Sequence, residues 1–368
     1  MNIDFARGLL KVAFAVSLVA SIVATPNAYA QQGGQPIRIR IGGPHTPDGA
    51  PWVKLLQEIF IPAVKASAAK SGHTVEFVEA WGGSVTKMSE TSATVQGRLL
   101  DISYVTFPAE VSKFPLHNFP YWLPFGNGDP VITYRATKAV YDEFPVLTQT
   151  FEQKYGQKLL GISTVQDYGI VSSFPVHSLD DLKGRKMASV GPMLDYVRAA
   201  GAVPVVSSMP EAYMSMQTRI YEGYLILPQA IVGMRMWEVA KNWTVTHFGS
   251  VSPHGLTINL DTWKSLPPAL QSAMMQAGNT WAEALAKNAK DTEESDLKKW
   301  REAGGNVTVL SPADREKWAA QFPANYVAER ARKVDAAGLP GTKVMAAYLK
   351  HLERLGYKPP RTWDLAAK

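Results

Sequence analysis

The sequence predicts an α/β protein made of two similar lobes that face each other across a cleft. Strand-like and helix-like segments alternate from residue 37 onward, which is typical of a doubly wound α/β lobe. In addition, Val95–Asp101 (VQGRLLD) resembles Met216–Glu222 (MQTRIYE), and each phrase follows a helix-like segment and precedes an apolar one. A helix-to-strand unit that occurs twice predicts two lobes, and a cleft between α/β lobes is a common ligand site.

Residues 1–30 are interpreted as a secretory signal peptide. Arg7 and Lys11 provide a basic start, and Val12–Val23 is almost wholly apolar. This apolar run is shorter than the ~20 residues that a membrane-spanning helix needs. Ala28-Tyr29-Ala30 is a small-x-small cleavage sequence. An uncleaved anchor remains the alternative, whereas a lipid anchor is excluded because the chain contains no cysteine.

The composition is that of an exported globular protein. Hydrophobic residues make up 46% of the chain and charged residues 19%, which is typical of a folded domain. The absence of cysteine excludes disulfides, a thiol nucleophile and a thiolate metal site. Together with the signal peptide, these features predict a location in the bacterial periplasm. The formal net charge is +6, but the basic residues are scattered among acids, and no nucleic-acid partner is expected.

The first lobe is expected to begin with the order β-α-β-α-β. Its strands are predicted near 37–41, 74–81 and 100–107, and its helices near 50–71, with a bend at Pro62, and 85–96. Residues 108–130 are rich in proline and aromatic residues, which indicates an ordered crossover loop packed by its rings. Helices are expected over 131–155.

The second lobe is expected to contain strands near 158–162, 169–173, 186–190 and 203–206, with helices over 193–200 and from Pro210. Ser178 is predicted to cap a helical turn that Gly184 ends. Residues 244–260 alternate and are expected to return to the first lobe. The remainder is predicted to be helical, with a core-facing apolar stripe from Leu270 to Leu285.

These elements divide the chain as follows. Residues 31–157 and 250–368 are assigned to lobe I with the C-terminal helices, and residues 158–249 to lobe II.

No motif predicts catalysis, so the chain is not expected to be an enzyme. A G-x-S-x-G elbow, a phosphate-binding glycine loop and H-E-x-x-H are all absent. The seven histidines are dispersed without metal-ligand spacing, and no metal or cofactor is expected. His45 follows the end of the first strand, where it either contacts a ligand or packs a loop. The acidic pairs Asp180-Asp181 and Glu293-Glu294 are interpreted as capping or solvated groups.

Several segments, taken in chain order, resemble the substrate-binding proteins of the tripartite ATP-independent periplasmic (TRAP) transporters, the DctP-like family. They are Gly82-Gly83 with Gln96 and Asp101, Leu123-Pro124-Phe125, Ser178–Met187, Glu211–Gly223 and Asn259–Pro268. The resemblance covers nearly the whole chain after residue 30. It implies a two-lobed periplasmic binding protein with a long C-terminal helix that spans both lobes. It also implies that the lobes close on a small-molecule solute and present it to a TRAP membrane permease.

The chain departs from this family at three kinds of position. The resemblance places a carboxylate-binding arginine at position 188, where this chain has Ala188. A family asparagine falls near Ile226 or Leu227, which are apolar. Arg98 and Arg219 stand where the family usually has glycine, and their side chains either reach the cleft or form ion pairs elsewhere.

Two interpretations of the ligand follow from these departures. In the first, an apolar pocket lined by Trp81, Tyr104 and Tyr168 takes an aromatic or weakly anionic compound. In the second, the ligand is an organic acid held by another cation. The predicted ligand-binding residues are His45, Trp81, Tyr104, Tyr168, Ala188, Ser189 and Leu227. The predicted function is solute capture for a TRAP permease, and the alternatives are a receptor for a sensor kinase or another transporter class, or an unrecognised exported hydrolase.

Overall fold

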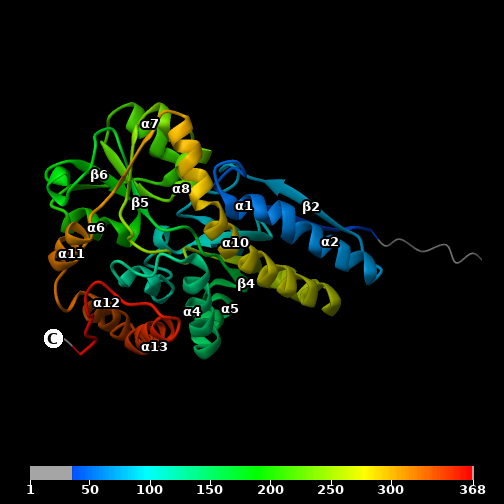
Figure 1. The fold of residues 1–368 in the computed structure, drawn as a ribbon. Coiled ribbons are helices and arrows are strands. Elements are labelled where there is room, and N and C mark those ends of the chain that lie inside the picture. The colour runs from blue at the N-terminus through cyan, green and yellow to red at the C-terminus, as the bar shows by residue number, and fades with distance from the viewer. Residues whose placement is uncertain (1–34, 367–368) are drawn as a thin grey trace, which may run out of the picture.

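The computed structural model describes residues 35–366 and contains two β-sheets flanked by helices (Figure 1). The first sheet has the strand order β2 (Val75–Ala80), β1 (Ile37–Gly42), β3 (Ile102–Thr106), β10 (His254–Asn259) and β4 (Gln157–Ile162). The second has the order β11 (Asn306–Val309), β9 (Asn242–Val245), β5 (Gly169–Ser172), β8 (Gly223–Ile226), β6 (Lys186–Ser189) and β7 (Val203–Val206). The predicted two-lobed α/β fold is thus confirmed, while the predicted signal peptide lies outside the described residues.

Helices occupy most of the remaining chain. The helices before the second sheet are α1 (Pro51–Leu55), α2 (Ile61–Lys70), α3 (Thr91–Gln96), α4 (Pro130–Glu143) and α5 (Val146–Tyr155). The second lobe contributes α6 (Leu194–Ala199), α7 (Ala212–Gln217) and α8 (Pro228–Gly233). The last part of the chain forms α9 (Leu260–Ser265), α10 (Pro268–Glu302), α11 (Pro312–Gln321), α12 (Tyr326–Asp335) and α13 (Gly341–Arg354).

Two of the predicted helices differ in detail from the structure. A π-helical turn, Leu56–Phe60, separates α1 from α2, because Pro62 in the first turn of α2 cannot donate a hydrogen bond to the preceding turn. The helix predicted over 85–96 is confined to α3, and the residues from 82 to 90 form turns that border the cleft.

The strand pairing changes the predicted division of the chain. Residues 158–162 were predicted to begin lobe II, but β4 pairs antiparallel with β10 in the first sheet. They therefore belong to lobe I. β11 pairs parallel with β9, so a strand from the C-terminal part completes the second sheet. Which sheet a short strand joins depends on which sheet edge lies near it in the folded chain. The local sequence does not determine that pairing.

Two segments, 163–168 and 246–253, cross between the sheets side by side. The Val165 N–H donates to the Val251 carbonyl at 3.1 Å, and the Thr164 and Ser252 hydroxyls lie 3.0 Å apart. The predicted return of residues 244–260 to the first lobe is confirmed, because β9 lies in the second sheet and β10 in the first. Together with α10, which leads into β11, these crossings connect the two sheets, and we name the two crossings the hinge.

The long helix α10 contacts both lobes (Figure 1). It packs against α2, α4 and β4 of the first lobe and against α8 of the second. Its contact with β4 requires glycine on both sides, since a Cβ on Gly278 would lie 2.3 Å from the Leu160 carbonyl oxygen and one on Gly161 2.7 Å from the Gly278 carbonyl oxygen. The predicted apolar stripe is buried, and the Trp281 indole donates to the Trp52 carbonyl at 3.0 Å.

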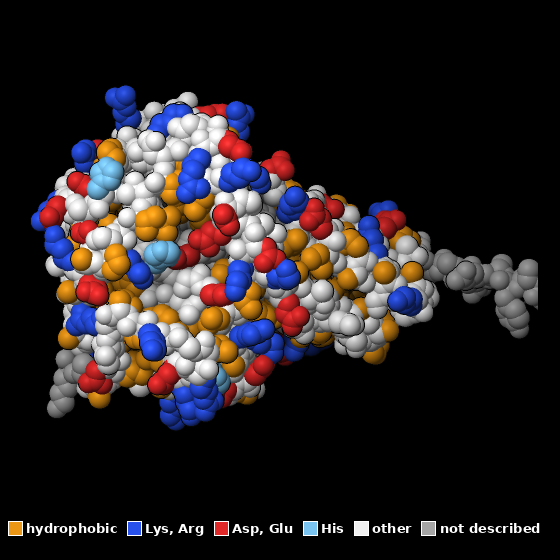
Figure 2. All heavy atoms as spheres, in the orientation of Figure 1, with side chains coloured by type: hydrophobic (Ala, Val, Ile, Leu, Met, Phe, Trp, Pro, Cys, Tyr) orange, Lys and Arg blue, Asp and Glu red, His pale blue; other side chains and the backbone are white. Residues whose placement is uncertain are grey.

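The predicted aromatic crossover is ordered and buried. Phe114, Phe119, Tyr121 and Trp122 are all buried, and the Phe114 and Phe151 rings lie 5.2 Å apart. On the face that Figure 2 shows, basic and acidic side chains are interspersed over both lobes. Between residues 35 and 366, no helix is both long and apolar enough to cross a bilayer.

Candidate functional site: the cleft between the lobes

Two adjoining cavities lie between the lobes. The outer cavity has a volume of about 490 Å³ and is walled by residues 82–89 and 108–109 on one side and by 190–191 and 206–211 on the other. The inner cavity is about 40 Å³ and shares Met88 and Val190 with the outer one. Together they form a site whose walls come from both lobes.

The inner cavity is apolar, aromatic and free of formal charge. None of its lining residues is Lys, Arg, Asp or Glu, and its polar atoms come from imidazole, indole and phenol groups or from the backbone. Its lining residues are His45, Trp52, Met88, Val165, Tyr168, Val190, Met209, Tyr224, Leu225, Ile226, Leu227, Pro253 and His254.

Four rings form a cluster at the first-lobe side of this cavity. The Trp52 ring lies 5.1 Å from His45 and 4.6 Å from His254, measured between centroids. Tyr104 packs behind them, 5.3 Å from the His254 ring. We name His45, Trp52, Tyr104 and His254 the ring cluster. Tyr104 lies in β3, His254 at the start of β10, His45 in the loop after β1 and Trp52 in α1, so all four come from the first lobe.

Each histidine of the ring cluster binds a hydroxyl group with two of its own nitrogens. The His45 backbone N–H donates to the Tyr104 hydroxyl at 3.1 Å, and His45 Nδ1 lies 2.8 Å from the same oxygen. In the same way, the His254 backbone N–H donates to Ser163 Oγ at 3.1 Å, and His254 Nδ1 lies 2.9 Å from it. Each hydroxyl accepts the backbone N–H, and among the described residues its hydrogen has no other acceptor in reach than Nδ1, so it donates to Nδ1. This pattern assigns the proton of both imidazoles to Nε2.

Burial keeps both imidazoles neutral. It lowers the pKa of His45 to about 3, and it holds the pKa of His254 well below its usual range, with His45 adding to the effect. Burial also raises the pKa of the Tyr104 phenol and of Tyr168. At neutral pH, the inner cavity therefore presents neutral rings with N–H donors and no net charge.

The outer cavity carries one basic and one acidic side chain, Lys87 from the first lobe and Glu211 from the second. The Glu211 carboxylate accepts the Ser208 backbone N–H at 2.9 Å. This bond and one from the Ser208 side chain hold the pKa of Glu211 below its usual value, and Lys87 adds to that effect. Lys87 makes no ion pair among the described residues.

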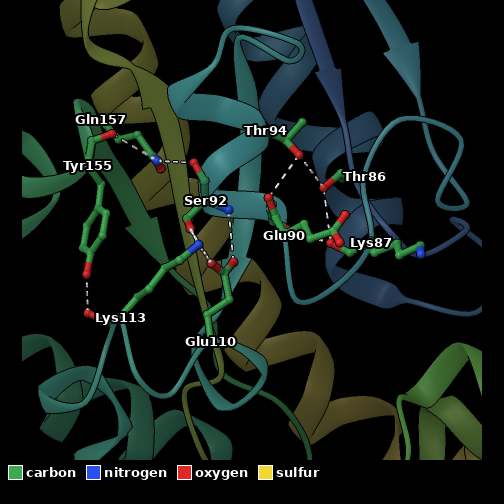
Figure 3. A network of polar contacts seen from close by, with 10 residues as sticks. Thr86, Lys87, Glu90, Ser92, Thr94, Glu110, Lys113, Tyr155 and Gln157 are labelled. Carbon is green, nitrogen blue, oxygen red and sulfur yellow. Dashed lines mark hydrogen bonds and ion pairs between the residues drawn. The ribbon is translucent and has the colours of Figure 1, made fainter.

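A polar network fixes the turn that carries Lys87 (Figure 3). The Thr94 hydroxyl donates to Thr86 Oγ1 at 2.8 Å, and the Thr91 hydroxyl donates to the Lys87 carbonyl at 3.2 Å. The buried Glu110 accepts the Ser92 backbone N–H at 3.0 Å, at the start of α3. The Lys87 ammonium extends away from this network in Figure 3. The network therefore fixes the backbone of the turn and leaves the ammonium free to bind a ligand.

The structure brings some of the predicted ligand-binding residues to this site. His45, Tyr168 and Leu227 line the inner cavity, and Tyr104 holds His45 from behind. Arg98 and Arg219 do not line either cavity.

The other three predicted residues do not line either cavity. The Trp81 indole instead donates to Glu79 at 2.7 Å. Ala188 and Ser189 are buried in β6, and the Ser189 hydroxyl donates to the Leu225 carbonyl at 3.2 Å. Ala188 pairs with Tyr224 in the parallel register of β6 and β8. Paired residues share a sheet face, so the Tyr224 ring stands beside the position of the family arginine.

Sequence reasoning missed Trp52, Met88, Tyr224, His254 and Lys87. Tyr224 had a signal, since it lies two residues after the second repeat phrase, and Tyr104 lies three residues after the first. The others lie in a helix, a turn and a distant strand. Only folding brings them together, so no local spacing could identify them.

An acidic group lies behind the cleft, where α10 passes the hinge. His247 Nδ1 is 3.0 Å from Asp167 Oδ2. Burial raises the pKa of Glu293 to about 7, and the nearby carboxylates of Asp167, Asp296 and Asp129 raise it further while His247 lowers it. Glu293 is thus partly buried, whereas Glu294 of the same acidic pair is exposed as predicted. No cluster of three or more metal-ligating side chains occurs in the described part of the chain.

Comparison with known proteins places the chain among solute-binding proteins. A profile of the bacterial extracellular solute-binding protein family 7 (DctP) matches residues 90–331. A solute-binding protein of Sulfitobacter sp. is 25% identical over 229 residues, which are 60% of this chain and 66% of that protein. The sialic acid-binding periplasmic protein of Vibrio cholerae is 28% identical over 37% of this chain and 43% of its own length. The matched segments thus span less than two thirds of either relative.

Solved structures share the fold over more of the chain. A solute receptor of Bordetella pertussis that binds pyroglutamic acid has a TM-score of 0.73 at 20% identity, over 85% of this chain and 99% of its own. A TRAP solute-binding protein from a marine metagenome, described as specific for aromatic acid ligands, has a TM-score of 0.75 at 16% identity, over 87% of this chain and all of its own.

Proposed function

The chain belongs to the bacterial extracellular solute-binding protein family 7, and we propose that it is the periplasmic solute receptor of a TRAP-type transporter. The observation that carries this proposal is the pair of cavities between two lobes that are joined by the crossings 163–168 and 246–253. A solute in these cavities touches both lobes at once. Contacts with both lobes exist only in the closed form, so the solute shifts the population toward closure. The closed receptor then delivers the solute to the membrane permease.

The proposed ligand is a small organic acid. The outer cavity, at about 490 Å³, lies within the range of small-molecule sites. Solved proteins with the same fold bind pyroglutamate, mandelate and uronates, which supports this class. Lys87 is the basic side chain that the outer cavity offers to a carboxylate.

A hydrolase is the competing proposal, because Ser163 Oγ lies 2.9 Å from His254 Nδ1. Ser163 is fully buried and does not line either cavity. Its hydroxyl hydrogen is directed to the histidine, while its oxygen accepts a backbone N–H. A substrate carbonyl in the cleft therefore has no path to this oxygen, and the receptor is favoured.

Thermal unfolding with a panel of organic acids, aromatic acids and polyols tests the receptor. A ligand at about 100 times its Kd raises the free energy of unfolding by ~2.7 kcal/mol. We expect at least one acid to do so and to be recovered intact by mass spectrometry. Transport of that acid into vesicles that carry the cognate permease then separates a transporter receptor from a receptor for a sensor kinase. A panel without any stabilising compound, or chemical conversion of the bound one, contradicts the proposal.

A further inference from the structure

We infer that the two cavities bind opposite ends of one solute. Its carboxylate lies at Lys87 in the outer cavity, and a small neutral oxygen group lies in the inner cavity between His45 and His254. The inference rests on the proposed function and specifies the solute as an organic acid with an aromatic body. That body carries a hydroxyl or carbonyl oxygen at the end remote from the carboxylate.

The inner cavity excludes the charged end of such a solute. None of its lining residues carries a formal charge, and a carboxylate that leaves water without a cationic partner is strongly disfavoured. Position 188, where the family resemblance places an arginine, is a buried alanine beside Tyr224. The second interpretation from the sequence, an acid held by another cation, therefore cannot apply inside this cavity.

The inner cavity does favour a hydrogen-bond acceptor. The bonds from Tyr104 and Ser163 to the two Nδ1 atoms leave both Nε2–H groups as donors, and neither Nε2 has a hydrogen-bond partner among the described residues. Both histidines line the cavity, so an oxygen that enters it between the two imidazoles can accept from these donors. A solute without such an oxygen displaces water and leaves the donors unpaired, which is costly.

The volume of the inner cavity limits the group that enters it. A water molecule needs roughly 10–15 Å³ on this measure, so about 40 Å³ admits a hydroxyl or carbonyl group but not a whole ring. The ring of the solute then lies at the junction of the two cavities. Met88 and Val190 belong to both linings and provide apolar contacts on opposite sides of that junction.

Lys87 provides the cation for the other end. Its backbone is fixed by Thr91, its ammonium forms no ion pair within residues 35–366, and the Glu211 carboxylate across the cavity is already engaged by the Ser208 N–H. A carboxylate beside Lys87 therefore gains a charge-assisted hydrogen bond. An ammonium binds as a point charge and not as a planar fork, so Lys87 fixes the carboxylate less strictly than an arginine would.

Calorimetric titration with 3-hydroxyphenylacetate and phenylacetate tests this arrangement, because the two acids differ only in the oxygen assigned to the inner cavity. We expect the wild type to prefer the hydroxylated acid by about 100-fold, because a site built around a hydroxyl leaves its own donors unpaired with the analogue. His45→Phe and His254→Phe should each reduce the preference to less than about 10-fold. Lys87→Met should weaken both acids by about 10-fold and leave the preference intact.

His177→Phe is the matched control, because His177 is exposed and, among the described residues, hydrogen-bonds through its backbone N–H alone. It should leave both affinities unchanged. A second measurement does not depend on the folding of the variants. In wild-type protein with ¹⁵N-labelled histidine, the Nε2 signals of His45 and His254 should shift on saturation with 3-hydroxyphenylacetate.

The outcomes separate this inference from the proposed function. An unchanged preference in both phenylalanine variants, an equal affinity of the wild type for the two acids, or unshifted Nε2 signals overturns the inference. If neither acid binds but pyroglutamate does, the receptor stands and the assigned solute class is wrong. If no acid of any kind binds, the proposed function itself fails.

Discussion

The helix-to-strand units α3–β3 of the first lobe and α7–β8 of the second have the same backbone conformation but differ in burial. Arg98 and Arg219 both have φ of 57°, the left-handed region that favours glycine. The Leu99 N–H donates to the Thr94 carbonyl at 3.0 Å, and the equivalent Ile220 N–H donates to Ser215 at 2.9 Å. Both helices thus end in the same Schellman cap.

The acid after each cap bonds to a neighbouring strand of its sheet in the same way. Asp101 accepts the Arg40 backbone N–H at 2.9 Å, and Glu222 accepts the Lys186 backbone N–H at 3.2 Å. Each acid also pairs with an arginine, Arg40 or Arg185. The Asp101 side chain is 5% exposed and that of Glu222 is 35% exposed. The two arginines are almost equally exposed, but the Asp101 carboxylate is far less exposed than that of Glu222. The same geometry therefore has a different energetic value in each lobe, because water screens the second pair more strongly.

The largest expected difference is between Asp101→Asn and Glu222→Gln. We expect Asp101→Asn to lower the free energy of unfolding by about 3 kcal/mol, because the buried carboxylate accepts three hydrogen bonds from Arg40 and one from Thr262. Glu222→Gln should cost less than about 1 kcal/mol. Urea unfolding of both variants measures these values, and equal losses would remove the contrast between the lobes.

The pH dependence of the Asp101 effect provides its control. Burial raises the pKa of Asp101, but the bonds from Arg40 and Thr262 outweigh it and leave the pKa below 3.8. The unfolded chain therefore binds this proton first as the pH falls. The stabilisation is complete above the unfolded pKa and is lost as the pH falls through the folded one, so Asp101→Asn should converge with the wild type in acid.

Glu293 belongs to neither unit and should show the opposite pH dependence. Its pKa of about 7 exceeds the ordinary 4.5, so the folded protein keeps a proton that the unfolded chain has released. Stability should therefore fall as the pH rises from about 4.5 to 7. Glu293→Gln should be more stable than the wild type by roughly 1–2 kcal/mol at pH 8, after allowing for the partial exposure of this carboxyl. Thermal unfolding at pH 5 and pH 8 measures the change, and a gain at pH 5 as large as that at pH 8 would refute it.

Arg98→Gly and Arg219→Gly test whether the two caps store the same strain. A non-glycine residue at positive φ costs about 1–2 kcal/mol, and glycine loses about 0.5–1 kcal/mol of that gain through its flexibility in the unfolded chain. Each variant should therefore be more stable by about 0.5–1 kcal/mol, and the double variant by the sum. Chemical denaturation of the three proteins checks both the equality and the additivity.

The smallest effect is expected at the residue after each of these arginines. Leu99 and Ile220 are 61% and 56% exposed. Leu99→Gln and Ile220→Gln should each change the free energy of unfolding by no more than about 0.5 kcal/mol. A larger loss of unfolding free energy at one of the two positions, measured in the same denaturation series, would show that the apolar side chain stabilises that cap alone.

The repeat and the order of the elements could be predicted from the sequence because both are local. The phrase around Arg98 and Arg219 identified two equivalent units, and alternation in β1 identified a strand with buried Ile39 and Ile41. The sheet to which β4 belongs could not be predicted, because pairing with β10 joins residues about a hundred positions apart. His254 was missed for the same reason, since it joins the ring cluster beside Trp52 only after the chain has returned from the second lobe.

The glycine contact between β4 and α10 has a consequence for how the molecule moves. At Gly161 and Gly278 the backbone of the helix touches the backbone of the strand. The helix therefore cannot shift relative to β4 without a steric clash. Toward the second lobe the helix is held by amides, with Gln229 donating to Asn288 at 2.9 Å and Gln166 donating to Asp296 at 3.0 Å. Long amide side chains reorient easily and can exchange partners. We therefore expect the helix to move as one rigid body with the first lobe. When a solute binds, the second lobe should shift along the C-terminal half of the helix.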